Sequence, residues 1–108
     1  MASKSSSNKP IGVIGAGSFG TAVSNLLAEK SNKVLLYART PERALKFQKE
    51  RVAGGQKLHD GIEVTNDLER VAQSCDVIFP VIPSANFRDL MRTMSPFLKP
   101  YHILIHGT

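Results

Sequence analysis

Three glycines near the start of the chain have the spacing of a phosphate-binding turn. Gly15, Gly17 and Gly20 form the pattern Gly-x-Gly-x-x-Gly after a short apolar segment. The first glycine permits a tight turn, the second lets backbone approach a pyrophosphate, and the third allows close packing of the next helix. Backbone N–H groups at residues 18–20 can then face an anion. The pattern predicts a dinucleotide site, the alternatives being a turn that only packs or one that holds another phosphate ligand.

A single arginine indicates which dinucleotide would bind. About 20 residues past such glycines, a domain that prefers NAD usually carries Asp or Glu, which accepts hydrogen bonds from the ribose. Residues 37–40 read YART, so Arg39 stands where that carboxylate would be. A guanidinium can pair with a 2′-phosphate and stack on adenine. We therefore expect NADP or NAD, with the arginine favouring NADP; a solvated loop residue is the alternative. Arg43, one helical turn later, is a second candidate to bind that phosphate, or is simply a charge on the surface.

A proline–serine turn marks the other side of the candidate site. Pro83 and Ser84 follow the apolar residues 76–82. Ligands of open α/β sheets bind outside the carboxyl ends of the strands, so we expect the nicotinamide side of a cleft to be lined by Pro83, Ser84, Asn86 and Phe87, with a core anchor as the alternative for Phe87. His106 is a candidate acid or base, or a strand-end histidine without a chemical role. The chain has no spacing typical of metal ligands, and its one cysteine excludes an internal disulfide.

Strands and helices that alternate along the chain must position these residues. Such alternation predicts a parallel sheet with right-handed crossovers, which is a Rossmann-type doubly wound α/β fold with strand order 3-2-1-4-5. Pro80 conflicts with a central strand because it removes a ladder hydrogen bond, so we expect a bulge or an early strand end there. The expected strands are 11–14, 33–38, 62–65, 76–82 and 101–106, and the expected helices are 18–30, 41–52, 67–73 and 84–94.

Local patterns predict finer details of these elements. Gly54 and Gly55 should break the second helix and lead into a polar loop over residues 56–61. Asn66 is the expected cap of the third helix. The first helix should bury one stripe of residues at helical spacing. That stripe consists of Phe19, Ala22, Val23, Leu26 and Leu27.

Composition bounds the class of protein. The chain has 108 residues, of which 42% are hydrophobic and 21% charged, which fits one soluble globular domain. No apolar run reaches the roughly 20 residues of a membrane helix, so no membrane partner is expected. The net charge of +5 comes from scattered basic residues, so no nucleic-acid partner is expected either. Residues 1–9 are polar and resemble a disordered tail rather than a secretory signal, so we expect a cytoplasmic protein.

The chain resembles the N-terminal domain of NAD(P)-dependent glycerol-3-phosphate dehydrogenase of the bacterial type. The resemblance rests on IGVIGAGSFGTA at residues 11–22, LYAR at 36–39, DVIFPVIPS at 76–84 with Arg88 beyond it, and the final Gly-Thr. It covers nearly all of residues 10–108, which we take as one NAD(P)-binding domain. Pro80 departs from the family, which has an aliphatic residue there.

The resemblance implies functions for several residues and for the whole protein. Ser18 and Phe19 would contact the pyrophosphate region of the cofactor, and Arg39 the adenosine ribose or its 2′-phosphate. The family reduces dihydroxyacetone phosphate to sn-glycerol 3-phosphate, at the entry to phospholipid synthesis. Its catalytic lysine and substrate-phosphate residues belong to a helical C-terminal domain beyond these 108 residues. We therefore expect no catalytic residue here and an inactive fragment. If the C-terminal domain normally covers one flank of the sheet, these residues alone expose apolar surface, so we also expect association, with a homodimer as the candidate form.

Two other functions remain open at this stage. One is a stand-alone dinucleotide-binding sensor that does no chemistry. The other is a related reductase, similar to ketopantoate reductase or 6-phosphogluconate dehydrogenase. The Phe-Gly-Thr-Ala continuation of the glycine turn and the proline–serine turn argue against this second alternative.

Overall fold

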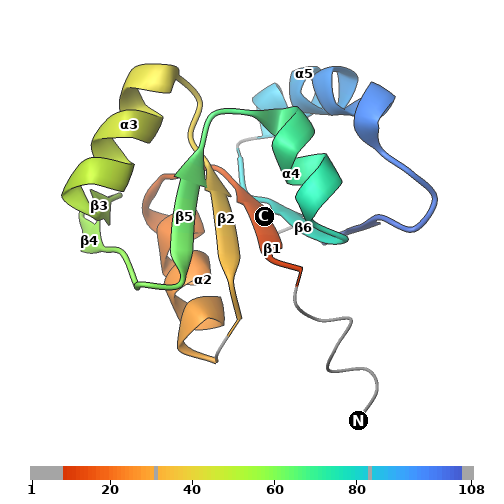
Figure 1. The fold of residues 1–108 in the computed structure, drawn as a ribbon. Helices are drawn as coiled ribbons and strands as arrows, with labels where there is room; N and C mark the ends of the chain where they lie inside the picture. Colours follow the sequence, from red (N-terminus) through yellow and green to blue (C-terminus); the bar gives the residue numbers. More distant parts are fainter. Residues whose placement is uncertain (1–8, 31, 83, 106–108) are drawn as a thin grey trace, which may run out of the picture.

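The computed structural model describes residues 9–30, 32–82 and 84–105, the side chains of residues 84 and 85 excepted. Within these residues, five parallel strands form one sheet in the order β5-β2-β1-β6-β7 (Figure 1). This is the predicted 3-2-1-4-5 order, so the Rossmann-type fold is confirmed. The strands are β1 (Ile11–Ile14), β2 (Val34–Tyr37), β5 (Ile62–Thr65), β6 (Val77–Pro80) and β7 (Ile103–Leu104).

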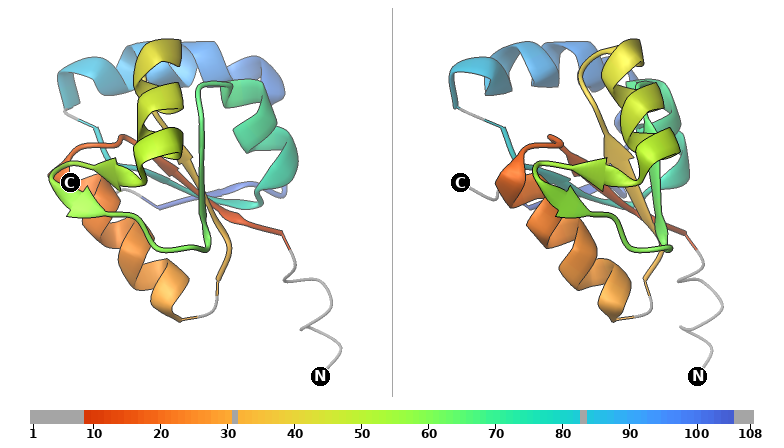
Figure 2. Two further views of the ribbon diagram at one scale, coloured as in Figure 1. Left: turned by 60° about the vertical axis from the view of Figure 1, so that its left-hand side comes forward. Right: turned by 90° about the vertical axis from the view of Figure 1, so that its left-hand side faces the viewer.

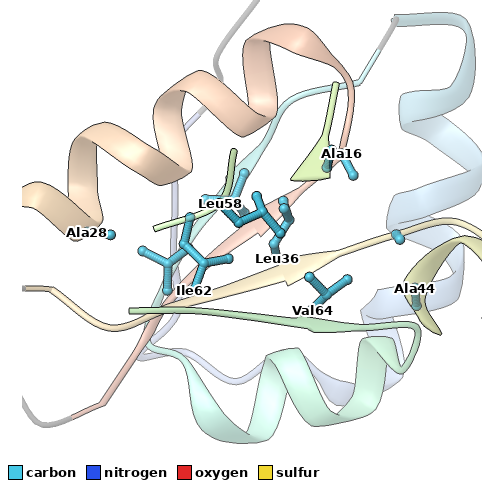
Figure 3. Packing of buried hydrophobic residues seen from close by; sticks show 11 residues of the cluster. Ala16, Ala28, Leu36, Ala44, Leu58, Ile62 and Val64 are labelled. Carbon is cyan, nitrogen blue, oxygen red and sulfur yellow. The ribbon is translucent and has the colours of Figure 1, made fainter. Parts of the chain in front are cut away.

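Helices cover both faces of this sheet. The helices are α2 (Ser18–Glu29), α3 (Pro41–Glu50), α4 (Leu68–Ser74) and α5 (Ser84–Met94), followed by the 3-10 helix η1 (Ser95–Phe97). One core cluster joins the sheet to α2 and α3 through residues that include Ala28, Leu36 and Ala44 (Figure 3). A second cluster joins it to α4 and α5 through residues that include Leu35 and Met94. Consecutive strand residues thus enter opposite cores, which is why the parallel strands read as continuous apolar runs.

The face that the first helix buries coincides only in part with the predicted apolar stripe. Val23 and Leu27 pack against the core as predicted, whereas Ala22 is exposed. Phe19 is 57% exposed and Leu26 is 56% exposed, so the predicted stripe is wrong at these positions. The buried residues of α2 are instead Gly20, Thr21, Ser24 and Ala28. The cause is the close approach of the helix to the turn before it, because a Cβ at Gly20 would lie 1.8 Å from the carbonyl oxygen of Gly15. No side chain fits at Gly20, and the other buried residues of this face, Thr21, Ser24 and Ala28, are small.

The segment after α3 forms a hairpin rather than the predicted loop. β3 (Val52–Ala53) and β4 (Gln56–Lys57) pair antiparallel across Gly54 and Gly55. These glycines have φ of +56° and +76°, in the left-handed region that two-residue hairpin turns require. The predicted polar loop over residues 56–61 is therefore wrong in its first part. Two glycines in sequence were the available signal for a hairpin, but the strands are too short to show alternation.

The third helix is capped one residue later than predicted. Asp67, not Asn66, is the cap, because its carboxylate accepts hydrogen bonds from the N–H groups of Glu69 and Arg70. A carboxylate also complements the positive end of the helix dipole. The Asn66 side chain instead donates to the carbonyl of Ala38 at 2.9 Å, just beyond the end of β2.

Pro80 ends β6, so the predicted early strand end is confirmed. Val81 donates its N–H to Ile14 of β1 at 2.8 Å. Because successive backbone groups point to opposite sides of a strand, the nitrogen of Pro80 faces β7. β7 pairs only with Val77 and Ile78, so the missing N–H lies past the paired part of that strand.

The described residues contain no helix long and apolar enough to cross a membrane.

Candidate functional site

A cavity of about 400 Å³ opens at the carboxyl ends of the central strands. Its walls include Ile14 at the end of β1, Tyr37 at the end of β2, and Ile82 just past β6. This is the edge at which open α/β sheets bind ligands, near the point where the strand order reverses. The cavity therefore lies where the sequence predicts a site.

The glycine turn forms one wall of this cavity and has the predicted geometry. Gly15 has φ of +120°, and a Cβ there would lie 2.3 Å from the carbonyl oxygen of Val81, so only glycine fits. At Gly17, by contrast, no heavy atom of the described residues lies within 4 Å of the place that a Cβ would take. The backbone of Gly17 is therefore accessible to a ligand, while Gly15 and Gly20 shape the turn.

The start of α2 is suited to an anion. Gly17 is its N-cap and makes no side-chain hydrogen bond, and the first turn, which is fully described, carries no acidic residue. The first N–H groups of a helix have no carbonyl partner within the helix, and the helix dipole places partial positive charge there. The turn thus offers donors and positive potential without a competing side chain.

Two arginines approach the same cavity from the other side. Arg39 and Arg43 both line it, beyond the end of β2 and in the first turn of α3. Thr40 positions this turn, because its side chain accepts a hydrogen bond from the Arg43 N–H and Pro41 follows it at the first helical position. The Arg43 guanidinium also lies 5.4 Å from the centre of the Phe47 ring. Both arginines are exposed, so a phosphate could reach either.

Tyr37 is a polar wall residue that the sequence pattern did not single out. Burial raises the pKa of its phenol, the positive charge of Arg39 lowers it, and the negative charge of Asp67 raises it. The phenol is therefore protonated at neutral pH and is a potential hydrogen-bond donor to a ligand in the cavity.

Helix α5 supplies the last wall through one face. Asn86, Asp89, Leu90 and Thr93 line the cavity at helical spacing. Leu90 is also buried in the core, while Asp89 lies 3.8 Å from the guanidinium of Arg92. Asn86 was predicted from its place after the strand, whereas the other three become recognisable only once the helix is docked.

Most of the predicted site residues are now placed. Gly15, Gly17 and Arg39 line the same cavity, although more than 20 positions separate the turn from the arginine. Gly20 is buried behind the turn. Ser18 and Phe19 are exposed at the start of α2 and are not among the residues that line the cavity.

The remaining predicted residues cannot be placed. Pro83 and His106 lie outside the described residues, as does the side chain of Ser84. Among the described residues, no group of His, Cys, Asp and Glu side chains could hold a metal ion.

A family model described as the N-terminus of NAD-dependent glycerol-3-phosphate dehydrogenase matches residues 10–108. The chain belongs to this family. That match agrees with the sequence resemblance and favours a glycerol-3-phosphate dehydrogenase over a reductase similar to ketopantoate reductase.

Curated proteins give the same assignment. The glycerol-3-phosphate dehydrogenase [NAD(P)+] of Ectopseudomonas mendocina is 42% identical over 95 residues, which are 84% of this chain and 28% of that protein. The protein of the same name from Geobacter metallireducens is 40% identical over 102 residues, covering 91% of this chain and 30% of the relative. The chain thus spans less than a third of the length of these glycerol-3-phosphate dehydrogenases.

Solved structures agree on the fold. The crystal structure of glycerol-3-phosphate dehydrogenase from Coxiella burnetii matches with a TM-score of 0.86 and 28% identity, over 94% of this chain and 32% of that one. A glycerol-3-phosphate dehydrogenase structure from Plasmodium falciparum matches with a TM-score of 0.84 at 15% identity, covering 99% of this chain and 34% of that one, which supports the fold alone.

Proposed function

We propose that this chain is the cofactor-binding part of an NAD(P)-dependent glycerol-3-phosphate dehydrogenase. The observation that carries the proposal is that Gly15, Gly17 and Arg39 line one cavity at the carboxyl ends of the strands. The names of the relatives, glycerol-3-phosphate dehydrogenase [NAD(P)+], support the choice of NADP or NAD as the ligand.

In this proposal each wall of the cavity binds a different part of the dinucleotide. The pyrophosphate lies against the glycine turn and the start of α2, at Gly17, Ser18 and Phe19, with Gly15 and Gly20 shaping that turn. The adenosine ribose, or its 2′-phosphate, lies near Arg39. The nicotinamide end extends toward Pro83. The open space at Gly17 and the exposed guanidinium support the first two placements.

The proposed reaction belongs to the longer protein. When bound, the reduced cofactor would supply a hydride to the carbonyl carbon of dihydroxyacetone phosphate, and a proton from the longer protein or from water would complete sn-glycerol 3-phosphate. Hydride transfer requires both reactants to be held at near-attack distance. We expect the 108 residues alone to bind cofactor without turnover, and the remaining length of the relatives to supply substrate binding and catalysis. Cytoplasmic localisation and a homodimer stay predictions.

Calorimetric titration with NADPH and with NADH tests the proposal. We expect NADPH to bind more tightly, and Arg39→Ala to weaken NADPH about 10- to 100-fold while NADH changes little, because a charge-assisted hydrogen bond is lost. Lys46→Ala is the matched control, since it removes one positive charge from an exposed position of α3 that does not line the cavity.

The possible results separate the parts of this proposal. If Arg39→Ala and Lys46→Ala lost the same affinity for NADPH, the loss would come from the change in net charge and not from a contact made by Arg39. Equal affinities of the unchanged chain for NADPH and NADH would remove Arg39 as a selector. Absence of binding by either cofactor would refute the proposal for this chain.

A further inference from the structure

The β3–β4 hairpin lies against the start of α2, beside the glycine turn (Figure 2). The Gln56 side chain donates a hydrogen bond to the backbone carbonyl of Ser18 at 2.9 Å. Gly54 lies against the turn with no room for a side chain, because a Cβ there would lie 2.7 Å from the carbonyl oxygen of Gly17 and 3.0 Å from the Cα of Ser18. The hairpin thus contacts two consecutive peptide groups of the turn.

A second contact fixes the hairpin further along the same helix. Asn25 donates its side-chain amide to the carbonyl of Lys57 at 2.9 Å and accepts the N–H of His59 at 2.9 Å. Asn25 lies about two helical turns after Ser18. Attachment at two places on one helix prevents the hairpin from rotating about either contact.

The contacted peptide groups are the ones whose N–H groups would face an anion. A peptide unit is planar and trans, so its C=O and N–H point in opposite directions. A donor held on the carbonyl of Ser18 therefore fixes the direction of the Phe19 N–H. Contact with the carbonyl of Gly17, which also accepts the Thr21 N–H at 2.9 Å, fixes the Ser18 N–H in the same way.

We propose that the hairpin holds the glycine turn in its binding conformation and that Gln56 is a positioning residue for the pyrophosphate of the dinucleotide. The inference rests on the proposed function, because it concerns the same site. Gln56 does not line the cavity, so it acts through the backbone of residues 17–19 and not by touching the ligand. Preorganised donors bind more tightly because less conformational entropy is lost on binding.

This mechanism has a distinctive signature. NADH, NADPH and ADP-ribose share the pyrophosphate, so loss of Gln56 should weaken all three by the same factor. Loss of Arg39 should instead act on NADPH alone. The two residues are therefore separable by ligand choice.

The first test replaces Gln56 with methionine, which has similar length and no hydrogen-bond donor. We expect the Kd of all three ligands to rise about three- to tenfold, because one hydrogen bond is lost. In the ligand-free chain, the NMR order parameters of the Ser18 and Phe19 amides should be lower in Gln56→Met than in the unchanged protein, because the direction of these N–H groups is less fixed. Gln73→Met is the matched control, because Gln73 is exposed on α4 and bonds only to Glu69 among the described residues.

The second test compares alanine at two neighbouring glycines. Gly54 and Gly55 both have positive φ, so Gly54→Ala and Gly55→Ala suffer similar backbone strain. A Cβ would collide with the glycine turn only at Gly54, since no described heavy atom lies within 4 Å of the corresponding place at Gly55. We expect the larger loss of affinity, and the larger decrease in the order parameters of the Ser18 and Phe19 amides, in Gly54→Ala.

Each outcome decides the inference. Unchanged affinity in Gln56→Met, a loss that differs between NADH and NADPH, or an equal loss in Gln73→Met would overturn it while the proposed function stands. If the unchanged chain binds no dinucleotide, the proposed function fails. The order parameters of the Ser18 and Phe19 amides in the ligand-free chain then decide alone: lower values in Gln56→Met support a turn held by the hairpin, and unchanged values refute it.

Discussion

The two edges of the sheet are built in different ways. At the β5 edge, side chains occupy the positions where a neighbouring strand would bond. Gln48 accepts the N–H of Val64 at 2.7 Å, and the Arg51 guanidinium donates to the carbonyl of Ile62 at 2.7 Å. Arg51 reaches this position from a left-handed backbone conformation, with φ of +60°, just after α3. This edge is closed by side chains of the chain itself.

The opposite edge, at β7, has apolar side chains in contact with solvent. Ile103 is 55% exposed and Ile105 is 41% exposed, and the nearby Tyr101 is 56% exposed. An uncovered strand edge is a template for pairing with another chain. Side chains on and just after a neighbouring helix can thus take the place of a strand at a sheet edge. At β7 we expect this chain to associate with another copy.

The largest expected effect comes from the first residues of the two edge strands. Ile62 is 2% exposed and Ile103 is 55% exposed, although both are isoleucines that begin an edge strand. Ile62→Ala should lower the free energy of unfolding by about 2–4 kcal/mol, because it leaves a cavity in the core. Ile103→Ala should change it by less than about 0.5 kcal/mol. Denaturant unfolding measures both, and equal losses would contradict the proposed difference between the edges.

A smaller effect should follow from opening the closed edge. Gln48→Ala leaves the N–H of Val64 without its side-chain partner, which should lower the free energy of unfolding by about 1–2 kcal/mol. Light scattering should also show more aggregation than in the unchanged chain, because a strand edge becomes available. Gln73→Ala is the control for loss of an exposed glutamine, and the same behaviour in both variants would argue against a role of Gln48 at the edge.

The core beside the open edge should be closed to solvent, which a pH titration can show. Cys75 is fully buried in the cluster that Leu104 of β7 packs against. Burial, with a further contribution from Asp76, raises the pKa of the Cys75 thiol from 9.0 to about 12. The unfolded chain therefore loses this proton first as the pH rises above 9.0, so stability is constant below that pH and falls between it and about 12.

Between pH 8 and 10 the decrease in unfolding free energy due to Cys75 should be about 1 kcal/mol. The quantity to measure is the difference between the unchanged chain and Cys75→Ala, because other groups also titrate in this range. Rapid reaction of the native thiol with a labelling reagent at pH 8 would show instead that the core beneath β7 opens readily.

Charged residues at the β7 edge should change stability least and association most. Ile103→Lys combined with Ile105→Lys should leave the unfolding free energy within about 0.5 kcal/mol, since both side chains are exposed. Sedimentation should show concentration-dependent association of the unchanged chain and a monomer for the double variant, because the added lysines block edge pairing. A variant that associates as strongly as the unchanged chain would place the contact elsewhere.

Much of the site was predictable because local signals determine it. The glycine spacing predicts the turn after β1. Beyond the end of β2, Arg39 stands where a domain that prefers NAD usually carries a carboxylate. Both ends must meet when parallel strands lie side by side, which the alternation of elements already indicates. By contrast, Asp89 gave no local signal, and it lines the cavity only because α5 packs where it does. Tyr37 was not singled out either, although it ends β2 opposite Ile14.

Periodicity and glycine spacing in the sequence were enough to predict the order of strands and helices, the parallel sheet and the glycine turn. Tertiary structure decided which face of α2 is buried, because close approach at Gly20 excludes Phe19 and Leu26 from the core. It also decided that a hairpin contacts the turn and that Gln48 and Arg51 close one edge. The residues that make these contacts belong to no recognisable motif. They meet only because the helices and strands pack together, and their spacing along the chain does not predict that packing.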